Sequence, residues 1–278
     1  TFKYPMSLIL TMNLSYRTDS MGGKPKGVAE SPTKAYNLLW ISPSFPVSGE
    51  QFRQPIPNQT VENMQGIAER NPYVDVQLWV DSRRMTDAQI GWLEKMIGEC
   101  PSNNMSLLDI RTVSEYNNHS FYNQPDDSPN WRIDKHSLIW RQVDVARILA
   151  CLQSGHDQVF YSDADITNLV VDSAEVQGRL KKHGIILGGA VDEKSGYPWY
   201  ENQFFGFDGR KREFFKLLYN RTLRDVAMKR ENGYMSYIDL INSELKGKEK
   251  IDTRDIVFQA RYDGTVALHP RHGEQRQS

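Results

Sequence analysis

The chain has 278 residues, of which 39% are hydrophobic and 25% are charged, and its formal net charge is −1. This balance predicts one large globular domain, or such a domain with a helical addition, and excludes the concentrated basic surplus of nucleic-acid-binding proteins. Cys100 and Cys151 are the only cysteines, which excludes a cysteine-based zinc site and makes a disulfide framework an unfavourable interpretation. No apolar run is long enough to cross a bilayer, so no membrane span is predicted.

Signals for the cellular compartment point in two directions. The low cysteine content favours a reducing compartment, whereas five Asn-x-Ser/Thr patterns would suit a secretory lumen. Because asparagine is common in this chain, chance accounts for most of these patterns, which begin at Asn13, Asn58, Asn104, Asn118 and Asn220. The first residue is threonine rather than methionine, which fits a chain that is part of a longer one.

Residues 1–34 are interpreted as an extension or linker, because the run Met21–Gly27 is rich in glycine, lysine and proline. We assign this segment no function and expect the folded domain to span residues 35–278. Within that domain, short apolar runs alternate with segments of helical periodicity. The predicted strands cover residues 35–41, 74–81, 107–110, 159–161, 184–190, 203–207, 256–258 and 266–268.

The predicted helices share an apolar stripe at helical spacing, and they cover residues 59–70, 86–97, 137–152, 212–229 and 239–244. Thr86 is the predicted N-cap of the second helix, with Gln89 completing a capping box. The remainder of residues 101–134 is rich in polar residues and proline, which predicts surface loop. Strands that alternate with helices predict an α/β sandwich whose ligand lies at the carboxyl edge of the strands.

An aspartate pair follows the apolar strand that ends at Tyr161. Alternation along an extended chain sends residues two apart the same way, so we expect the carboxylates of Asp163 and Asp165 to converge at the carboxyl edge of that strand. Two carboxylates so close need a positive partner. A hard divalent cation with oxygen ligands meets that need, and it would in turn hold a phosphate or diphosphate.

Three upstream segments accompany the aspartate pair. Trp40 ends the first strand, and Asn71-Pro72 precedes the segment Leu78–Asp81. Asp144 and Arg147 are three residues apart, hence on one face of the helix before the acidic strand. In this order, the segments resemble the GT-A glycosyltransferases with a DxD motif, in particular the clostridial glucosylating toxins, bacterial effector glucosyltransferases and yeast-type Golgi mannosyltransferases.

The resemblance spans residues 35–210 and implies a single GT-A, Rossmann-like domain with helical additions. It implies that Trp40 stacks on the nucleotide base and that Asp144 and Arg147 contact the ribose and the donor sugar. Asp163 and Ala164 would also bind the nucleotide sugar, and Asp165 with Asp163 would ligate Mn²⁺ or Mg²⁺ on the diphosphate. The chemistry agrees, because an arginine beside an aspartate offers donors and an acceptor to sugar hydroxyls, and a metal neutralises the charge that builds on the diphosphate.

Other positions fit the resemblance less well. The Gly-Gly pair of the family is Ser154-Gly155 here. A carboxyl-terminal residue normally completes the metal shell in the family, and the tail of this chain leaves Asp255, His269 and His272 as unranked metal-ligand candidates. Asn202 is a candidate for catalysis or for a donor-sugar contact, with a turn as the alternative.

Each of these residues also has a plain structural interpretation. An aspartate after a strand often caps a turn, a strand tryptophan usually packs in the core, and an exposed Asp–Arg pair contributes little. The combination of motifs outweighs these interpretations for the aspartate pair and for Trp40, whereas Trp79 is predicted to be a core residue. The aromatic cluster Tyr197, Trp199 and Tyr200 stays open between carbohydrate stacking and core packing.

A second enzyme class fits the same aspartates. The strand followed by Asp163–Thr167 matches the D-x-D-x-T signature of haloacid-dehalogenase phosphatases, in which Asp163 would be the nucleophile and Asp165 the general acid, with Mg²⁺ between them. That signature normally stands near the start of its domain, whereas here it lies past the middle of the chain, and it leaves Trp40 unexplained. A noncatalytic lectin-like module is a third interpretation, which is favoured only if the chain does not bind metal.

The sequence therefore predicts a metal-dependent transferase that moves a hexose, with glucose from UDP-glucose as first candidate, onto a protein or glycan hydroxyl. The resemblance implies retention of the anomeric configuration. No carboxylate can be assigned as a covalent nucleophile, so departure and attack on one face of the sugar is the working hypothesis. The match to toxins and effectors favours a secreted bacterial effector and virulence factor that acts in a host cytosol, with a Golgi or secretory lumen as the alternative.

Overall fold

The computed structural model describes residues 33–47, 49, 51–126, 137–166, 168–191, 194–196, 198–228, 233–245, 251–258, 261–262 and 265–266. Nearly all of the predicted extension, residues 1–34, lies outside the described residues. The same holds for the metal-ligand candidates His269 and His272 and for Tyr197 of the aromatic cluster.

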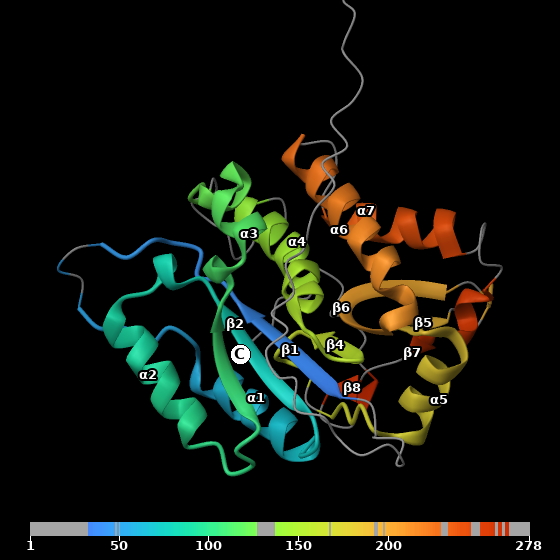
Figure 1. The fold of residues 1–278 in the computed structure, drawn as a ribbon, viewed down its shortest axis with the longest axis horizontal. Helices are drawn as coiled ribbons and strands as arrows, with labels where there is room; N and C mark the ends of the chain where they lie inside the picture. Colours follow the sequence, from blue (N-terminus) through green and yellow to red (C-terminus); the bar gives the residue numbers. More distant parts are fainter. Residues whose placement is uncertain are drawn as a thin grey trace, which may run out of the picture. The chain divides into compact units, whose positions relative to one another are not determined.

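A seven-stranded sheet forms the centre of the fold, in the order β3-β2-β1-β4-β6-β5-β7 (Figure 1). The first four strands of this order are parallel, β6 is antiparallel to β4 and β5, and β7 is parallel to β5. The strands are β1 Lys34–Trp40, β2 Asp75–Val80, β3 Met105–Asp109, β4 Gln158–Ser162, β5 Ile185–Val191, β6 Pro198–Asp208 and β7 Val257–Phe258. The predicted α/β class is confirmed. The last predicted strand does not join this sheet, because β9, Thr265–Val266, pairs with β8, Arg261–Tyr262.

Helices cover both faces of the sheet, and each face has its own apolar core. One core includes α4 Leu138–Gln153, α6 Arg212–Ala227 and α7 Gly233–Leu240, which a π-helical turn, Ile241–Leu245, continues. The other includes α1 Asn58–Arg70, α2 Asp87–Gly98 and α5 Ala174–His183. Within the described part of the chain, no helix is long and apolar enough to span a membrane.

Local signals explain where several helices begin and end. The capping box of α2 is confirmed, because Gln89 N donates to Thr86 Oγ1 at 3.3 Å and Thr86 N donates to Gln89 Oε1 at 2.9 Å. Helix α5 was not predicted, although Ser173 caps its start and Gly184, with φ of 72°, ends it.

The prediction of loop over the remainder of residues 101–134 was partly wrong. The described part of this segment contains α3, Ser114–Asn118, between the 3₁₀ turns Ile110–Thr112 and Ser120–Asn123. These turns follow β3 at the carboxyl edge of the sheet, where they border the loops that follow β1 and β2. Further 3₁₀ turns lie at Ser82–Arg84, Gly209–Lys211 and Thr253–Asp255.

A bulge in β6 shapes the edge of the sheet beyond β4. Leu187 pairs with Phe205 while Gly188 pairs with Glu201, so residues 202–204 have no partner in β5. The close approach needs glycine, because a Cβ on Gly188 would lie 2.8 Å from the carbonyl oxygen of Phe204, and Gly189 has φ of 148°. Since β6 is antiparallel to β4, the bulge brings Asn202 to the edge where β4 ends.

Candidate active site at the carboxyl edge of the sheet

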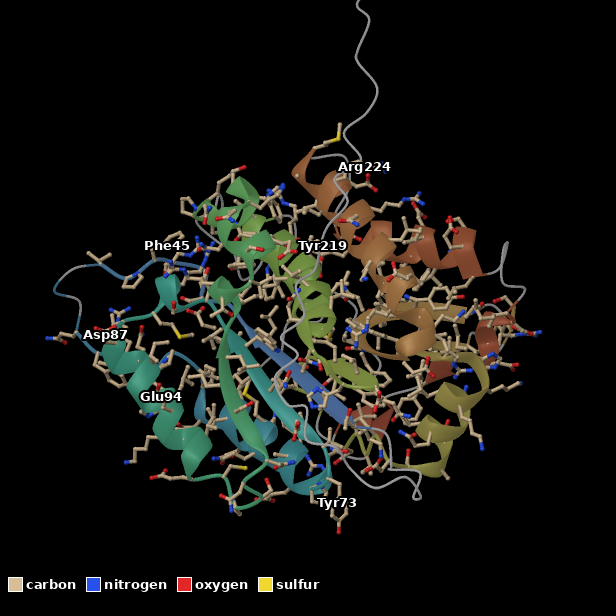
Figure 2. All side chains as sticks on the ribbon, in the orientation of Figure 1. Phe45, Tyr73, Asp87, Glu94, Tyr219 and Arg224 are labelled. Carbon is tan, nitrogen blue, oxygen red and sulfur yellow. The ribbon has the colours of Figure 1, made fainter. Side chains whose placement is uncertain are left out.

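Parallel pairing brings the ends of β1 and β4 to one edge of the sheet. Asn37 lies opposite Tyr161, so Trp40 and the residues after Ser162 reach the same level. Figure 2 marks this edge by Phe45, which follows β1, and the opposite edge by the exposed Tyr73, which precedes β2. The predicted candidates Trp40, Asp163, Ala164 and Asp165 therefore share the edge at which α/β sheets bind ligands.

Arg147 is the centre of a compact polar cluster at this edge. Its Nη1 lies 3.3 Å from Asp163 Oδ1, and its Nη2 lies 3.2 Å from Asp144 Oδ1. The same Nη1 donates to the carbonyl oxygen of Asn202 at 2.9 Å, and the side-chain amide of Asn202 donates to Asp144 Oδ1 at 2.9 Å. Four predicted site residues thus lie together. The Arg147 side chain is only 7% exposed, so the two carboxylates compensate a buried charge rather than forming a surface ion pair.

Tyr161 fixes the cluster from the strand side. Its hydroxyl donates to Asp163 Oδ1 at 2.7 Å, and its ring centroid lies 5.2 Å from the guanidinium carbon of Arg147. Burial raises the pKa of Tyr161 well above its ordinary value, although Arg147 lowers it in part, so the hydroxyl remains a donor at neutral pH. Burial alone would lower the pKa of Arg147, but Asp163, Tyr161 and Asp144 outweigh it and raise the pKa above its ordinary value. Arg147 is a permanent cation.

The two aspartates have different surroundings. Strand β4 ends at Ser162, and Ile166 N donates to the carbonyl oxygen of Asp163 at 3.1 Å, so the residues between them form a turn. Asp163 is half-buried beside Arg147, whereas Asp165 is exposed in the turn. The alternation of an extended strand therefore does not extend to Asp165, because this residue lies in the turn after β4. Arg147 is a positive partner of Asp163.

Among the described residues, no three acidic, histidine or cysteine side chains are grouped as a metal cage. Asp255 pairs with Lys182 at 3.0 Å, near the end of α5, so it lies at the amino edge of the sheet and is no ligand for this site. Asp165 and the second carboxylate oxygen of Asp163 remain as candidate metal ligands. Mg²⁺ commonly binds one or two carboxylates together with phosphate oxygens and water. The carboxylates present fit a cation that arrives with a diphosphate.

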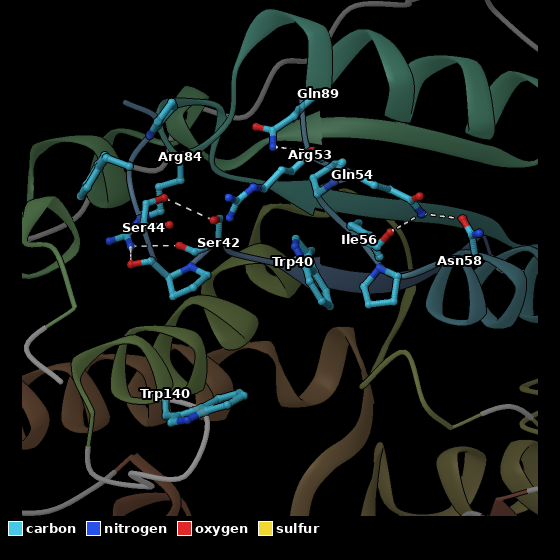
Figure 3. A pocket seen from close by; sticks show the side chains of 15 residues that line it. Trp40, Ser42, Ser44, Arg53, Gln54, Ile56, Asn58, Arg84, Gln89 and Trp140 are labelled. Carbon is cyan, nitrogen blue, oxygen red and sulfur yellow. Dashed lines mark hydrogen bonds between the residues drawn. The ribbon is translucent and has the colours of Figure 1, made fainter. Parts of the chain in front are cut away.

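A cavity of about 940 Å³ lies between the loop after β1, the starts of α1 and α2, and Trp140 at the start of α4 (Figure 3). Trp40 and Trp140 are among its lining residues, together with prolines of the loop. The indole N–H of Trp40 is buried without an acceptor in the described residues. Trp140 precedes Asp144 by one helical turn and Arg147 by two, so these three residues share one face of α4. Ala164 packs, like Trp40, against the core on the other side of the sheet from α4.

Two residues that shape this site were not predicted as site residues. Tyr161 was part of the matched motif without a role, and its position two residues before Asp163 on one strand face was a usable signal. Arg84 lines the cavity although its side chain is fully buried. Its only signal in the sequence is its spacing of three residues from Asp81. Of the aromatic cluster, Tyr200 is a core residue and Trp199 is 58% exposed.

No protein-family model matches the sequence, and no curated protein is significantly similar to it. Solved structures do share its arrangement. One described as "Structure of Transferase" aligns over 83% of this chain and 91% of its own, with 13% identity and a TM-score of 0.52. One described as "PaToxG Glycosyltransferase" aligns over 79% and 72%, with 12% identity and a lower TM-score of 0.48. The first similarity shows a shared mixed α/β fold with the transferase structure.

Proposed function

We propose that the protein is a glycosyltransferase that uses a nucleotide sugar. The observation that most directly supports this proposal is the meeting of Asp144, Arg147, Asp163 and Asn202 around one buried guanidinium. The cluster presents fixed acceptors and a permanent cation at the ligand-binding edge of an α/β sheet. Sugar hydroxyls require such acceptors, and the negative charge that develops on a departing diphosphate requires such a cation.

The two parts of the site suit the two ends of a nucleotide sugar. The cavity beside Trp40 would hold the base and ribose, since an indole ring and prolines offer flat apolar surface. Asp144 and Asn202 would orient the sugar, with Arg147 toward the diphosphate. Asp165, with Asp163, would hold Mn²⁺ or Mg²⁺, which when bound supplies charge stabilisation for the leaving diphosphate.

We propose transfer with retention, from UDP-glucose as first candidate donor, onto a protein or glycan hydroxyl. In this reaction the bond between the anomeric carbon and the diphosphate breaks while the acceptor oxygen bonds to the same face of that carbon. The acceptor proton passes to the diphosphate oxygen that leaves. Asp144 and Asp163 are both engaged by Arg147, which disfavours either as a covalent nucleophile. The same engagement disfavours Asp163 as the nucleophile of a phosphatase.

The proposed setting is the host cytosol, into which a bacterium would secrete the protein as an effector. Both cysteines are buried free thiols, which suits a reducing compartment. A secretory lumen is the alternative.

A donor-hydrolysis screen tests the proposed function. UDP- and GDP-sugars are incubated with Mn²⁺ and the wild-type protein, the double variant Asp163→Ala/Asp165→Ala, or the control Asp87→Ala on the exposed first turn of α2. Release of nucleotide from one donor, lost in the double variant and kept in the control, supports the proposal. Silence with every donor, together with turnover of p-nitrophenyl phosphate, contradicts it in favour of a phosphatase.

A further inference from the structure

Arg84 is a fully buried arginine that binds three separate segments. Its Nη1 donates to the carbonyl oxygens of Ser42 at 3.0 Å and Pro43 at 3.3 Å. Its Nη2 reaches the carbonyl oxygens of Tyr122 at 3.4 Å and Gln124 at 3.0 Å, and Gln142 Oε1 at 2.9 Å. These acceptors belong to the loop after β1, to the segment after α3, and to α4. A single guanidinium therefore joins all three.

The segments that Arg84 joins border the proposed donor site. Ser42 and Pro43 line the cavity, and the ring centroid of Phe45, in the same wall, lies 4.5 Å from the guanidinium carbon of Arg84 (Figure 3). Gln142 stands on α4 between Trp140, which lines the cavity, and Asp144, which belongs to the polar cluster. Arg84 thus fixes the wall of the cavity relative to the helix that carries the cluster.

Compensation of the Asp81 charge alone does not explain why Arg84 is buried at this position. Asp81, whose Oδ2 lies 3.4 Å from Arg84 Nε, already has a second arginine: Arg83 Nη2 lies 3.0 Å from the same oxygen. Tyr116 also donates to this oxygen, at 2.9 Å. Of these two arginines, only Arg84 also binds the loop that follows β1 and the helix α4. The planar fork of a guanidinium can serve several carbonyl oxygens at once, which a lysine ammonium on a flexible stem does not reproduce.

We infer that Arg84 is a positioning residue that holds the loop after β1 against α4 and thereby sets the width of the cavity. The inference rests on the proposed function for its ligand, a nucleoside diphosphate, but its structural part does not. Without Arg84, the carbonyl oxygens of Ser42, Pro43 and Gln124 would need water as partner, and the loop would open to admit it. Looser walls weaken ligand binding more than they slow the chemical step, which depends on the cluster.

Hydrogen exchange on the whole chain tests the structural part. Arg84→Lys is compared with wild type and with the matched control Arg83→Lys, which changes the other arginine on Asp81. We expect exchange about tenfold faster in residues 41–46 and 119–124 of Arg84→Lys and unchanged exchange in β4. In Arg83→Lys, exchange in residues 41–46 should stay as in wild type, whereas residues 119–124 do not discriminate because Arg83 Nη1 donates to Asn123 Oδ1. Unchanged exchange in Arg84→Lys, or equally fast exchange of residues 41–46 in both variants, would overturn the inference.

Phe45→Ala covers the case in which Arg84→Lys does not fold. It removes the ring beside the guanidinium from a half-buried position in the loop. Exchange in residues 41–46 should rise while exchange in residues 119–124 stays as in wild type. An unchanged loop in Phe45→Ala would contradict the inference.

Calorimetry with UDP and Mn²⁺ tests the functional part. In Arg84→Lys we expect the Kd for UDP and the KM for UDP-glucose hydrolysis to rise about tenfold, with kcat within about threefold of wild type. A fall in kcat with an unchanged KM would overturn the positioning role. If wild type binds no nucleoside diphosphate, the proposed function fails, and the exchange experiment alone decides the role of Arg84.

Discussion

The cluster around Arg147 and the cavity beside Trp40 both include residues of α4 but are built in different ways. In the cluster, each contact joins charged or strongly polar groups at 2.7 to 3.3 Å. In the cavity, prolines and aromatic rings share the wall with uncharged polar side chains and two arginines, Arg53 and Arg84. The buried indole N–H of Trp40 has no acceptor among the described residues. The cluster is rigid because its charges are mutually compensated. The cavity instead depends on the position of the loop after β1, which Arg84 binds.

The largest expected effect is the loss of the cation at the centre of the cluster. Arg147→Met leaves Asp144 and Asp163 without their shared partner, so we expect the free energy of unfolding to fall by about 3–5 kcal/mol and activity to be lost. Urea unfolding measures the loss. In the control Arg179→Met, which breaks a pair with Glu175 on the surface of α5, the loss should stay below about 1 kcal/mol. Similar losses in both variants would show that the cluster is an ordinary ion-pair network.

Substitution of Asp165 should lower activity while leaving the free energy of unfolding nearly unchanged. Because its side chain is exposed, Asp165→Asn should leave the free energy of unfolding within about 0.5 kcal/mol of wild type. Donor hydrolysis at saturating Mn²⁺ should nevertheless fall roughly 10²- to 10³-fold, since one ligand of the proposed cation is lost. Asp87→Asn serves as control. Full activity in Asp165→Asn would exclude this carboxylate from metal binding.

Substitutions in the cavity should change the affinity for UDP. Trp40→Ala removes the flat surface on which a base would stack, so we expect the affinity for UDP to weaken by about 1–3 kcal/mol, roughly 5- to 150-fold. Trp40→Phe should lie between this variant and wild type. Trp92→Ala on α2 controls for the loss of a tryptophan elsewhere. Calorimetry that finds equal affinities in Trp40→Ala and wild type would place the base outside the cavity.

The smallest effect concerns the segment that Arg84 ties to the cavity wall. His119 Nδ1 accepts from Phe121 N at 3.2 Å, and burial lowers the pKa of His119 below its ordinary value of 6.5. His119 therefore binds a proton more tightly in the unfolded chain than in the folded one. Its contribution to the free energy of unfolding is fully present above about pH 6.5 and is lost as the pH falls toward the folded-state pKa. We expect a loss below about 1 kcal/mol between about pH 7.5 and 5.5 in urea unfolding, absent in His119→Asn, which keeps a side-chain acceptor. A slope that persists in His119→Asn would assign it to other groups.

The positions of most strands and helices along the chain could be predicted because their apolar patterns are local. The capping box at Thr86 and the strand that ends at Ser162 are read from a few neighbouring residues. Helix α5 was not predicted because only two of its residues, Val176 and Leu180, are buried, and the adjacent Lys181 and Lys182 suggested a solvated loop. The bulge in β6 could not be predicted, since it depends on the register between two strands rather than on either strand alone.

The site was predictable where spacing and motif agree. Asp144 and Arg147 share a helix face, and Arg147 contacts both Asp144 and Asp163 in the structure. The different surroundings of Asp163 and Asp165 follow from where β4 ends, and strand boundaries are the least certain part of a sequence interpretation. The role of Arg84 could not be predicted because most of its partners are main-chain oxygens, which no pattern of side chains indicates.

The antiparallel strand β6 also has a consequence for how the chain is made. Arg147 emerges from the ribosome 55 residues before Asn202, whose carbonyl oxygen it binds. Until β6 has been synthesised and has paired with β4, the guanidinium lacks that acceptor, and Asp144 lacks the amide of Asn202. An amino-terminal fragment that stops before β6 therefore carries the acidic motif without the assembled cluster, and only the longer chain joins both halves of the site.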